Sequence, residues 1–304
     1  MAQLTRGPHL LLLADVARDI KLAHSVFAMP FAILGAFLAR DADLSWGVFA
    51  AQLMLVVACM IAARTWAMLV NRLADRSFDA VNPRTARRLF ASNQATPRQG
   101  WIVALGAAAL FVSFASAFGL AFANWLPAAL SLPVLAWIAL YSYTKRFTWL
   151  CHLFLGGALA ASPIAAAIAV RPTFLTESAS VWWLAAMVAC WVAGFDVIYA
   201  LQDIAFDRTA GLKSVPARFG PKGAIWISRL LHLAAFAALA MAWSADDRLQ
   251  TVTLLALAIV AGLLIAEHVV LARRGQDGLE MAFFTLNGIV SCVFGLLASI
   301  DSLA

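Results

Sequence analysis

Residues 46–70 read WGVFAAQLMLVVACMIAARTWAMLV, and residues 71–85, NRLADRSFDAVNPRT, follow them directly. A helix needs about 20 consecutive apolar residues to cross the hydrocarbon core of a bilayer, so the first stretch predicts a membrane-spanning helix. The second stretch brings three arginines, two aspartates and two asparagines to the end of that helix. One explanation is a solvated helix end whose charges only orient the helix in the membrane. The rest of the chain decides whether that explanation is sufficient.

The composition of the whole chain is that of a membrane protein. Of 304 residues, 63% are hydrophobic and 12% are charged, whereas a soluble domain is about 45–50% apolar and about 25% charged. We therefore expect one transmembrane domain over residues 1–304 rather than two soluble domains. The net charge of +6 does not indicate a nucleic-acid partner, because the basic residues fall in short segments between apolar stretches and do not form one patch.

Long apolar stretches recur along the chain and predict an all-α polytopic membrane protein with about nine transmembrane helices around a central cavity. The two longest polar connections are residues 71–99 and 202–223, and residues 1–21 predict an amphipathic segment lying at the membrane surface. The predicted spans are residues 22–39, 46–70, 100–122, 125–141, 151–170, 180–201, 224–243, 250–271 and 281–300.

The distribution of lysine and arginine predicts how these helices are oriented. If the N-terminus is cytoplasmic, the outer connections hold only Arg40, Arg171 and Arg248 of the 22 basic residues, and Arg64 lies inside the second span. Cytoplasmic connections are enriched in lysine and arginine. We therefore expect the N-terminus inside, the C-terminus outside, and both long polar connections on the cytoplasmic side.

The polar residues of the first connection follow a helical period. Asn71, Asp75 and Asp79 are spaced i, i+4, i+8, which places them on one side of a helix, and Arg64 continues that side into the membrane. A proline disfavours helical geometry in the residue before it, so Pro83 predicts that the helix ends near Val81. Taken alone, this pattern also fits a solvated helix end with Arg/Asp pairs.

A second acidic stripe appears more than a hundred residues later, in DVIYALQDIAFDRTAGLKS (196–214). Asp196, Tyr199, Asp203 and Asp207 again share one helical face. Asp196 lies within the apolar run, where an ionisable residue is costly and indicates function. Because both stripes end even-numbered spans, we expect them to reach the same membrane face.

The two stripes together predict a particular kind of ligand. Facing carboxylates repel each other unless a cation lies between them, and oxygen ligands without histidine or cysteine suit a hard cation such as Mg²⁺. Neighbouring bases could hold phosphate oxygens directly. The predicted ligand is a lipid with a diphosphate head, bound at the membrane surface with its chain in an apolar cavity. The bases in question are Arg72, Lys145, Arg146 and Lys213.

Some ionisable residues outside the stripes have simpler interpretations. His152 begins the fifth span, and a lone histidine at a helix end is more often an interfacial or capping residue than a functional one. Glu267 and His268 lie inside the eighth span, where snorkelling or an interhelical hydrogen bond is the expected role.

These motifs resemble those of the UbiA superfamily of intramembrane prenyltransferases. The similarity includes N-R-x-x-D-x-x-x-D followed by N-x-R-T, and D-x-x-Y-A-x-Q-D-x-x-x-D-x-x-x-G-x-K-S. YSYTKRFT (141–148) resembles the family's Tyr-Pro-x-x-Lys-Arg segment, with Ser142 where proline is usual, and KLAHSVFAMPFAILGAF (21–37) resembles the start of its bacterial aromatic-acid branch. The resemblance extends over essentially the whole chain. RTARRLFASNQAT (84–96) departs from the family's Pro-Leu-x-x-Gly stretch, so the shape of that loop is not implied.

The resemblance implies roles for both motifs. The carboxylates would bind the prenyl diphosphate through Mg²⁺, and the bases would neutralise the leaving diphosphate. Asp196 and Tyr199 are candidates to orient the aromatic acceptor or to stabilise a carbocation, and Arg64 is a candidate to hold an acceptor carboxylate. The residues expected at the metal are Asn71, Asp75, Asp79, Asp203 and Asp207, and those expected at the diphosphate are Asn71, Arg72, Lys145, Arg146 and Lys213.

The function implied by the resemblance is Mg²⁺-dependent transfer of a polyprenyl chain from polyprenyl diphosphate to an aromatic acid, foremost 4-hydroxybenzoate, in respiratory quinone biosynthesis. A dihydroxynaphthoate acceptor such as 1,4-dihydroxy-6-naphthoate, in menaquinone biosynthesis, is the alternative within the family. The implied location is a bacterial-type inner membrane, with the active site toward the cytoplasm. A secondary transporter is an alternative of another class, but transporters bind at broken helices near the midplane, whereas these carboxylates concentrate at one face.

Overall fold

The computed structural model describes residues 15–19 and 27–303, and the regular elements in these ranges are all helical. Within these described ranges, eight helical segments are long and apolar enough to cross a membrane, and the shorter α2 (Met29–Ala39) is also apolar. The predicted all-α polytopic fold is confirmed. The eight segments are α3 (Trp46–Ala74), α5 (Pro97–Phe122), α6 (Leu126–Thr144), α7 (Cys151–Val170), α9 with α10 (Ser180–Thr209), α11 (Val215–Ser244), α12 (Thr251–Arg274) and the last span (Met281–Asp301).

The first and last predicted spans differ from what the structure describes. The first predicted span, 22–39, begins among residues that the structure does not describe, and α2 covers its second half. The predicted surface segment 1–21 also lies outside the described residues, except for 15–19, which are helical. The last span differs from a uniform helix, because a π-helix, η4 (Met281–Leu286), precedes α13 (Asn287–Asp301).

The two long polar connections are partly helical. α3 ends at Ala74, and after a break at Asp75 the short α4 (Arg76–Val81) ends at the predicted residue, Val81. The second connection is built from η2 (Ala200–Asp203), α10 (Ile204–Thr209) and the first turns of α11.

α11 starts nine residues before the predicted seventh span, at Val215 rather than at residue 224. Ser214 explains this start, because its side chain accepts a hydrogen bond from the Ala217 N–H at 3.3 Å and so caps the helix. The chain then continues through a kink at Gly220, whose φ of 72° suits a residue without Cβ.

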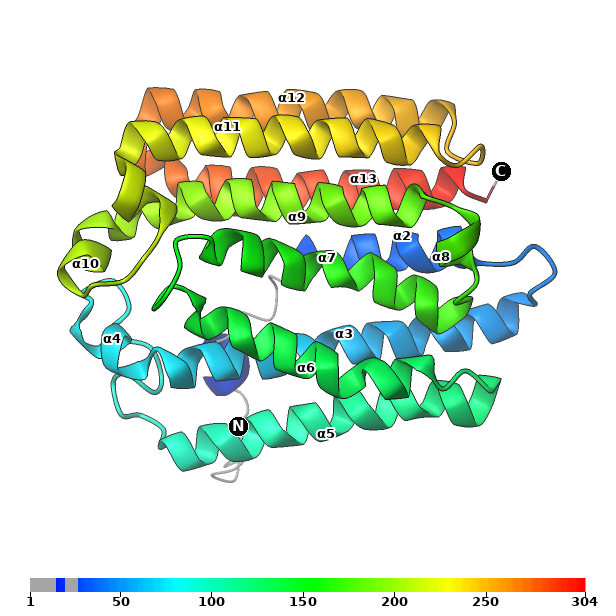
Figure 1. Ribbon diagram of the computed structural model, residues 1–304, viewed down its shortest axis with the longest axis horizontal. Helices are drawn as coiled ribbons and strands as arrows, with labels where there is room; N and C mark the ends of the chain where they lie inside the picture. Colours follow the sequence, from blue (N-terminus) through cyan, green and yellow to red (C-terminus); the bar gives the residue numbers. More distant parts are fainter. Residues whose placement is uncertain (1–14, 20–26, 304) are drawn as a thin grey trace, which may run out of the picture.

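The long helices run side by side along one axis (Figure 1). α9 contacts both α7 and α11, α3 contacts α5 and α6, and α2 contacts α7 and α13. The largest hydrophobic cluster surrounds α9, where Trp191, Met187 and Phe31 are fully buried. Large apolar side chains such as Leu120 and Leu233 are exposed on the outside, as expected for a surface that contacts lipid.

Close helix contact is achieved with small residues, as the Ala- and Gly-rich α7 sequence suggests. A Cβ added at Gly156 would clash with the backbone carbonyl of Ala189 on α9. α7 is thereby held against α9, and this contact fixes the relative positions of His152 on α7 and Asp196 on α9.

The short helices α4 and α10 lie at the same end of the bundle (Figure 1). The prediction that both acidic stripes reach the same end is therefore confirmed. The termini of α6 and α7 complete this end, because Lys145 directly follows α6 and the Lys213 N–H donates to the Lys145 carbonyl oxygen at 2.6 Å.

Candidate active site

The two polar connections are joined by a direct ion pair. Arg84, in the loop after α4, donates from Nε to Asp203 Oδ1 at 3.0 Å and from Nη2 to Oδ2 at 2.6 Å. Asn82 Nδ2 also donates to Asp203 Oδ1, at 3.3 Å. Residues more than a hundred positions apart thus share one carboxylate, and both Asn82 and Arg84 belong to the N-x-R-T part of the first motif.

Asp75 is the buried carboxylate nearest to the end of α6. Lys145 Nζ lies 3.6 Å from its Oδ2, Arg146 Nη2 lies 3.5 Å from its Oδ1, and Asn71 Nδ2 donates to Oδ2 at 3.3 Å. Burial raises the pKa of Asp75, and the charges of Lys145 and Arg146 oppose that rise. The sequence prediction that Asn71, Lys145 and Arg146 act near this aspartate agrees with their positions.

Asp79 and Asp207 are buried, and the carboxylate of each accepts from a polar side chain. Arg88 Nη1 contacts both oxygens of Asp79, at 2.8 and 2.9 Å. The hydroxyl of Ser214 donates to Asp207 Oδ2 at 2.8 Å. Both carboxylates therefore lie among polar partners, although neither partner was assigned a role from the sequence.

Two of the predicted phosphate-binding bases are engaged elsewhere. Arg72 is buried, donates from Nε to Asp19 Oδ2 at 3.2 Å, and donates from Nη1 to Asn71 Oδ1 at 3.1 Å. Lys213 Nζ donates to the Phe147 carbonyl oxygen at 3.1 Å. In this arrangement Arg72 ties α3 to the described N-terminal residues, and Lys213 ties the α10–α11 connection to the end of α6.

Asp196, at the membrane end of the second stripe, contacts His152. This residue is buried, and its Nδ1 lies 2.6 Å from Asp196 Oδ2. The Val215 N–H donates to its Nε2 at 3.3 Å, so Nδ1 carries the proton and donates to Asp196. His152 is therefore a buried partner of the candidate catalytic carboxylate. It is not interfacial as predicted, but it does cap a helix, because Val215 is the first residue of α11.

Tyr199, a member of the second stripe, contacts the first motif through Arg84. Arg84 Nη1 donates to its hydroxyl at 3.3 Å, and the guanidinium carbon lies 5.5 Å from the centre of its ring. Tyr199 and Asp203 thus contact the same arginine, which fixes their relative positions.

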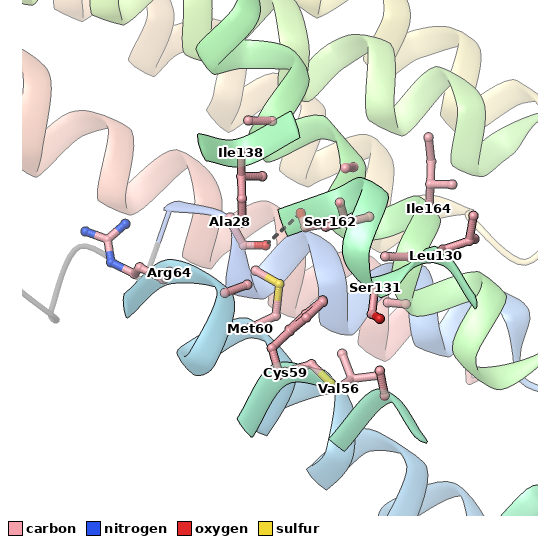
Figure 2. Close-up of a pocket in the computed structure, with 18 of the residues that line it drawn as sticks. Ala28, Val56, Cys59, Met60, Arg64, Leu130, Ser131, Ile138, Ser162 and Ile164 are labelled. Carbon is pink, nitrogen blue, oxygen red and sulfur yellow. Dashed lines mark hydrogen bonds between the residues drawn. The ribbon is translucent and has the colours of Figure 1, made fainter. Parts of the chain in front are cut away.

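A cavity of about 340 Å³ lies between α3, α5, α6 and α7. Figure 2 shows Cys59 and Met60 of α3, Ser131 of α6 and Ser162 of α7 along its walls, with Arg64 at one edge. The lining is apolar apart from Arg64, Ser131, Tyr141 and Ser162. The intramembrane arginine predicted from its depth is therefore part of an apolar chamber.

Tyr141 connects this cavity with the charged residues. It lines the cavity and interacts electrostatically with Arg72, Asp75, Asp196 and Arg64. Tyr141 belongs to the segment YSYTKRFT, for which the sequence indicated no role at this position. Its place in the cavity wall, within electrostatic range of Asp75 and Asp196, puts the apolar chamber beside the acidic stripes.

The donor atoms suit a hard cation, although the described residues contain no cluster of three His, Cys, Asp or Glu side chains arranged around a metal. Carboxylate and amide oxygens are the ligands that Mg²⁺ prefers, and the two stripes provide them. Basic side chains contact three of these carboxylates, and each carboxylate has further lone pairs with which it could bind a metal.

An apolar chamber within a helical bundle, with the carboxylates and bases of two motifs at one end of that bundle, is the arrangement expected of a membrane protein that handles an amphiphile with an anionic head. Residues 28–289 match the model of the UbiA prenyltransferase family. The chain belongs to this family and is a multi-pass membrane prenyltransferase, so the resemblance found in the sequence is confirmed.

The chain is similar in sequence to several 4-hydroxybenzoate octaprenyltransferases. A 4-hydroxybenzoate octaprenyltransferase of Methylococcus capsulatus is 30% identical over 254 residues, which cover 80% of each chain. One from Saccharophagus degradans is 30% identical over 258 residues, covering 85% of this chain and 82% of the relative. One from Shewanella sediminis is 35% identical over 190 residues, covering 62% of this chain and 63% of the relative.

Solved structures agree with the fold. The apo structure of a UbiA homolog from Aeropyrum pernix K1 has a TM-score of 0.81 and 31% identity, covering 92% of this chain and 98% of that one. A UbiA homolog from Archaeoglobus fulgidus bound to GPP and Mg²⁺ has a TM-score of 0.68, covering 95% of this chain and all of that one. At 18% identity, the second structure supports the fold alone.

Proposed function

We propose that the chain transfers a polyprenyl group from polyprenyl diphosphate to an aromatic acid, 4-hydroxybenzoate, in respiratory quinone biosynthesis. The observation that carries this proposal is the carboxylate–base cluster of the two motifs at one end of a helical bundle that also holds an apolar cavity lined by Arg64 and Tyr141. Relatives that are 30% identical over four fifths of their length are 4-hydroxybenzoate octaprenyltransferases.

The charged end would bind the diphosphate. The carboxylates of both motifs would hold Mg²⁺, which would supply positive charge beside the diphosphate, in keeping with the Mg²⁺ bound to the Archaeoglobus fulgidus homolog. The bases would donate directly to phosphate oxygens. The proposed metal ligands are Asn71, Asp75, Asp79, Asp203 and Asp207, and the proposed diphosphate-binding residues are Asn71, Arg72, Lys145, Arg146 and Lys213.

Transfer would begin with ionisation of the allylic C–O bond. Basic residues fixed beside the departing diphosphate stabilise the charge that develops on it. The electron-rich ring of the acceptor attacks the resulting carbocation, ortho to the hydroxyl, and then loses a proton. The apolar cavity walls exclude water, which would otherwise capture the cation.

The acceptor would be held by residues deeper in the membrane. A guanidinium binds a carboxylate through two parallel hydrogen bonds, so Arg64 is proposed to hold the carboxylate of the aromatic acid. Asp196, positioned by His152, and Tyr199 are proposed to orient the phenol ring or to stabilise the cation.

A dihydroxynaphthoate, as in menaquinone biosynthesis, is the second candidate acceptor. The segments HSVFAMPF (24–31) and RTWAMLVNR (64–72) resemble the naphthoate-prenylating branch of the family at least as well as the 4-hydroxybenzoate branch. Both acceptors present a carboxylate and an electron-rich hydroxylated ring, so the same chemistry serves either one.

The proposed setting is a bacterial inner membrane, with the charged end of the site toward the cytoplasm. The asymmetry of lysine and arginine between alternate connections supports this orientation. Labelling of single cysteines introduced at Arg208 and at Asp247, from each side of sealed vesicles, tests it. Labelling of the Arg208 position from outside intact cells would contradict it.

The decisive experiment is an acceptor screen with the purified protein, polyprenyl diphosphate and Mg²⁺. Release of diphosphate only when an aromatic acid is present supports transfer, whereas a transporter would release none. The screen should compare 4-hydroxybenzoate with dihydroxynaphthoates. Asp75→Ala and Asp203→Ala should each abolish transfer, and retained activity in either variant would refute the proposed metal–diphosphate site.

A further inference from the structure

The last span contains a feature that the proposed reaction does not yet use. Its first six residues, Met281–Leu286, form the π-helix η4, and α13 follows. A π-turn holds one residue more than an α-turn, and each residue of an α-helix turns the chain by about 100°. The extra residue therefore rotates the side chains before α13 around the helix axis, relative to an unbroken α-helix. Such turns are frequent at functional sites. Here the turn places the ring of Phe283 against Tyr199, with ring centroids 4.1 Å apart.

A buried amide holds this wide turn. Asn287, the first residue of α13, is fully buried, and its Nδ2 donates to the carbonyl oxygen of Ala282 within the turn at 2.9 Å. The same Nδ2 donates to Glu267 Oε1 on α12 at 3.2 Å, and Asn287 Oδ1 accepts from Trp191 Nε1 on α9 at 2.6 Å. Both amide hydrogens and the amide oxygen are therefore used, which fixes the orientation of the side chain.

The positions of its partners show what Asn287 controls. Trp191 belongs to α9, the helix that carries Asp196 and Tyr199, and Glu267 belongs to α12. The amide thus sets the register of the π-turn against α9 and α12 together. Polar groups buried within a membrane span are costly unless they are hydrogen-bonded, so three fully buried polar side chains indicate a constraint on geometry.

The consequence reaches the active site through two contacts. Phe283 packs on the ring of Tyr199, and the Tyr199 hydroxyl accepts from Arg84 Nη1 at 3.3 Å. Arg84 in turn makes the two hydrogen bonds to Asp203. A shift of the π-turn would therefore move the phenol of Tyr199 relative to the ion pair that joins the two motifs.

We propose that Asn287 is a positioning residue of the transfer reaction, which maintains the π-turn that seats Phe283 against Tyr199 and so orients the Tyr199 hydroxyl. This inference rests on the proposed function, because it takes Tyr199 to act at the reacting groups. A purely structural role, as an interhelical hydrogen bond between α12 and α13, is the alternative. Only the proposed role makes the effect of Asn287 depend on the Tyr199 hydroxyl.

The test is a double-mutant cycle on the purified full-length protein. Asn287→Leu should lower kcat by about 10- to 100-fold, as expected for a small misplacement of a catalytic group, with a much smaller change in KM for polyprenyl diphosphate. Tyr199→Phe keeps the ring and removes the hydroxyl. In the Tyr199→Phe background, Asn287→Leu should change kcat by less than about twofold, because residues that act through one group are not additive.

Control and companion variants separate positioning from stability. Asp301 is buried at the other end of α13, where its carboxylate accepts hydrogen bonds from the Gln250 and Thr253 N–H groups. Asp301→Asn replaces this carboxylate and weakens those hydrogen bonds. It should lower the Tm without lowering kcat. Phe283→Leu leaves the amide network intact and should show the same non-additivity with Tyr199→Phe, which provides the test if Asn287→Leu does not fold.

The outcomes are distinct. If wild-type protein transfers no prenyl group to any aromatic acid, the proposed function fails. If the wild type is active but the Asn287 or Phe283 effect is unchanged in the Tyr199→Phe background, the positioning role is refuted and the proposed function stands. A fall in kcat for Asp301→Asn as large as that for Asn287→Leu would also refute it.

Discussion

Arg84 makes the contact between the two motifs, and Arg84→Gln removes its guanidinium. The lost hydrogen bonds are those to Asp203, at 3.0 and 2.6 Å, and that to the Tyr199 hydroxyl, at 3.3 Å. The side chains of Arg84 and Asp203 are 32% and 17% exposed. Hydrogen bonds to charged groups contribute about 1.5–3 kcal/mol and exposed ion pairs about 0–1 kcal/mol, so the half-buried pair should contribute about 2 kcal/mol.

A free-energy change of about 2 kcal/mol corresponds to about a 30-fold change in an equilibrium. If transfer needs the two motifs joined as observed, Arg84→Gln should lower kcat/KM for polyprenyl diphosphate by about that factor. The assay is initial-rate diphosphate release at saturating acceptor, with detergent-purified protein whose Tm is measured in parallel.

Arg76→Gln is the matched control. Arg76 lies on α4 and is exposed. Arg76→Gln therefore removes one positive charge at the same end of the bundle, as Arg84→Gln does. It should leave kcat/KM nearly unchanged. A fall for Arg84→Gln no larger than that for Arg76→Gln would refute the reasoning, because general charge at the membrane surface would then explain both.

Other contacts lead to further expected outcomes. Arg64→Ala should raise KM for the aromatic acid about 10- to 100-fold, the loss expected for a charged hydrogen-bonded contact, and an acceptor lacking the carboxylate should not distinguish the variant from wild type. His152→Leu leaves Asp196 without its 2.6 Å partner and should lower kcat about tenfold or more. It should also lower the Tm, because the buried Val215 N–H loses its acceptor, and an unaltered kcat would contradict a role for this pair. Gly156→Leu should lower the Tm or prevent folding, because its side chain would clash with Ala189, and Gly157→Leu on the next position is the control for helix propensity and hydropathy.

Much of the fold follows from hydropathy and charge patterns. Continuous apolar stretches identify membrane helices because lipid allows few other backbone conformations, and the end of α4 at Val81 follows from Pro83. The early start of α11 does not follow from hydropathy, because its first turns are polar and depend on the cap at Ser214. The π-turn of the last span cannot be read from the sequence either, because the hydrogen bonds of Asn287 that hold it involve residues on other helices.

The carboxylates of the candidate site were predictable, but most of their partners were not. Asp75, Asp79, Asp203 and Asp207 stand out because a helical period of acids after an apolar run is costly to place in a membrane protein without a purpose. Arg88 and His152 carry no such pattern. Their roles depend on how loops and helices fold back in space, which single-sequence periodicity does not describe.

The loop RTARRLFASNQAT is the clearest case, because it departs from the family pattern and still supplies parts of the site. Its first residue, Arg84, contacts Asp203, and Arg88 contacts both oxygens of Asp79. The Leu89 N–H donates to Asp19 Oδ1 at 3.0 Å, and Asp19 also accepts from Arg72. One loop therefore contacts both acidic motifs and, through Asp19, the described N-terminal helix. Sequence divergence in such a loop alters the charged wall of the site while the aspartates stay in place, so differences in head-group or acceptor recognition within the family can arise here without any change in the catalytic carboxylates.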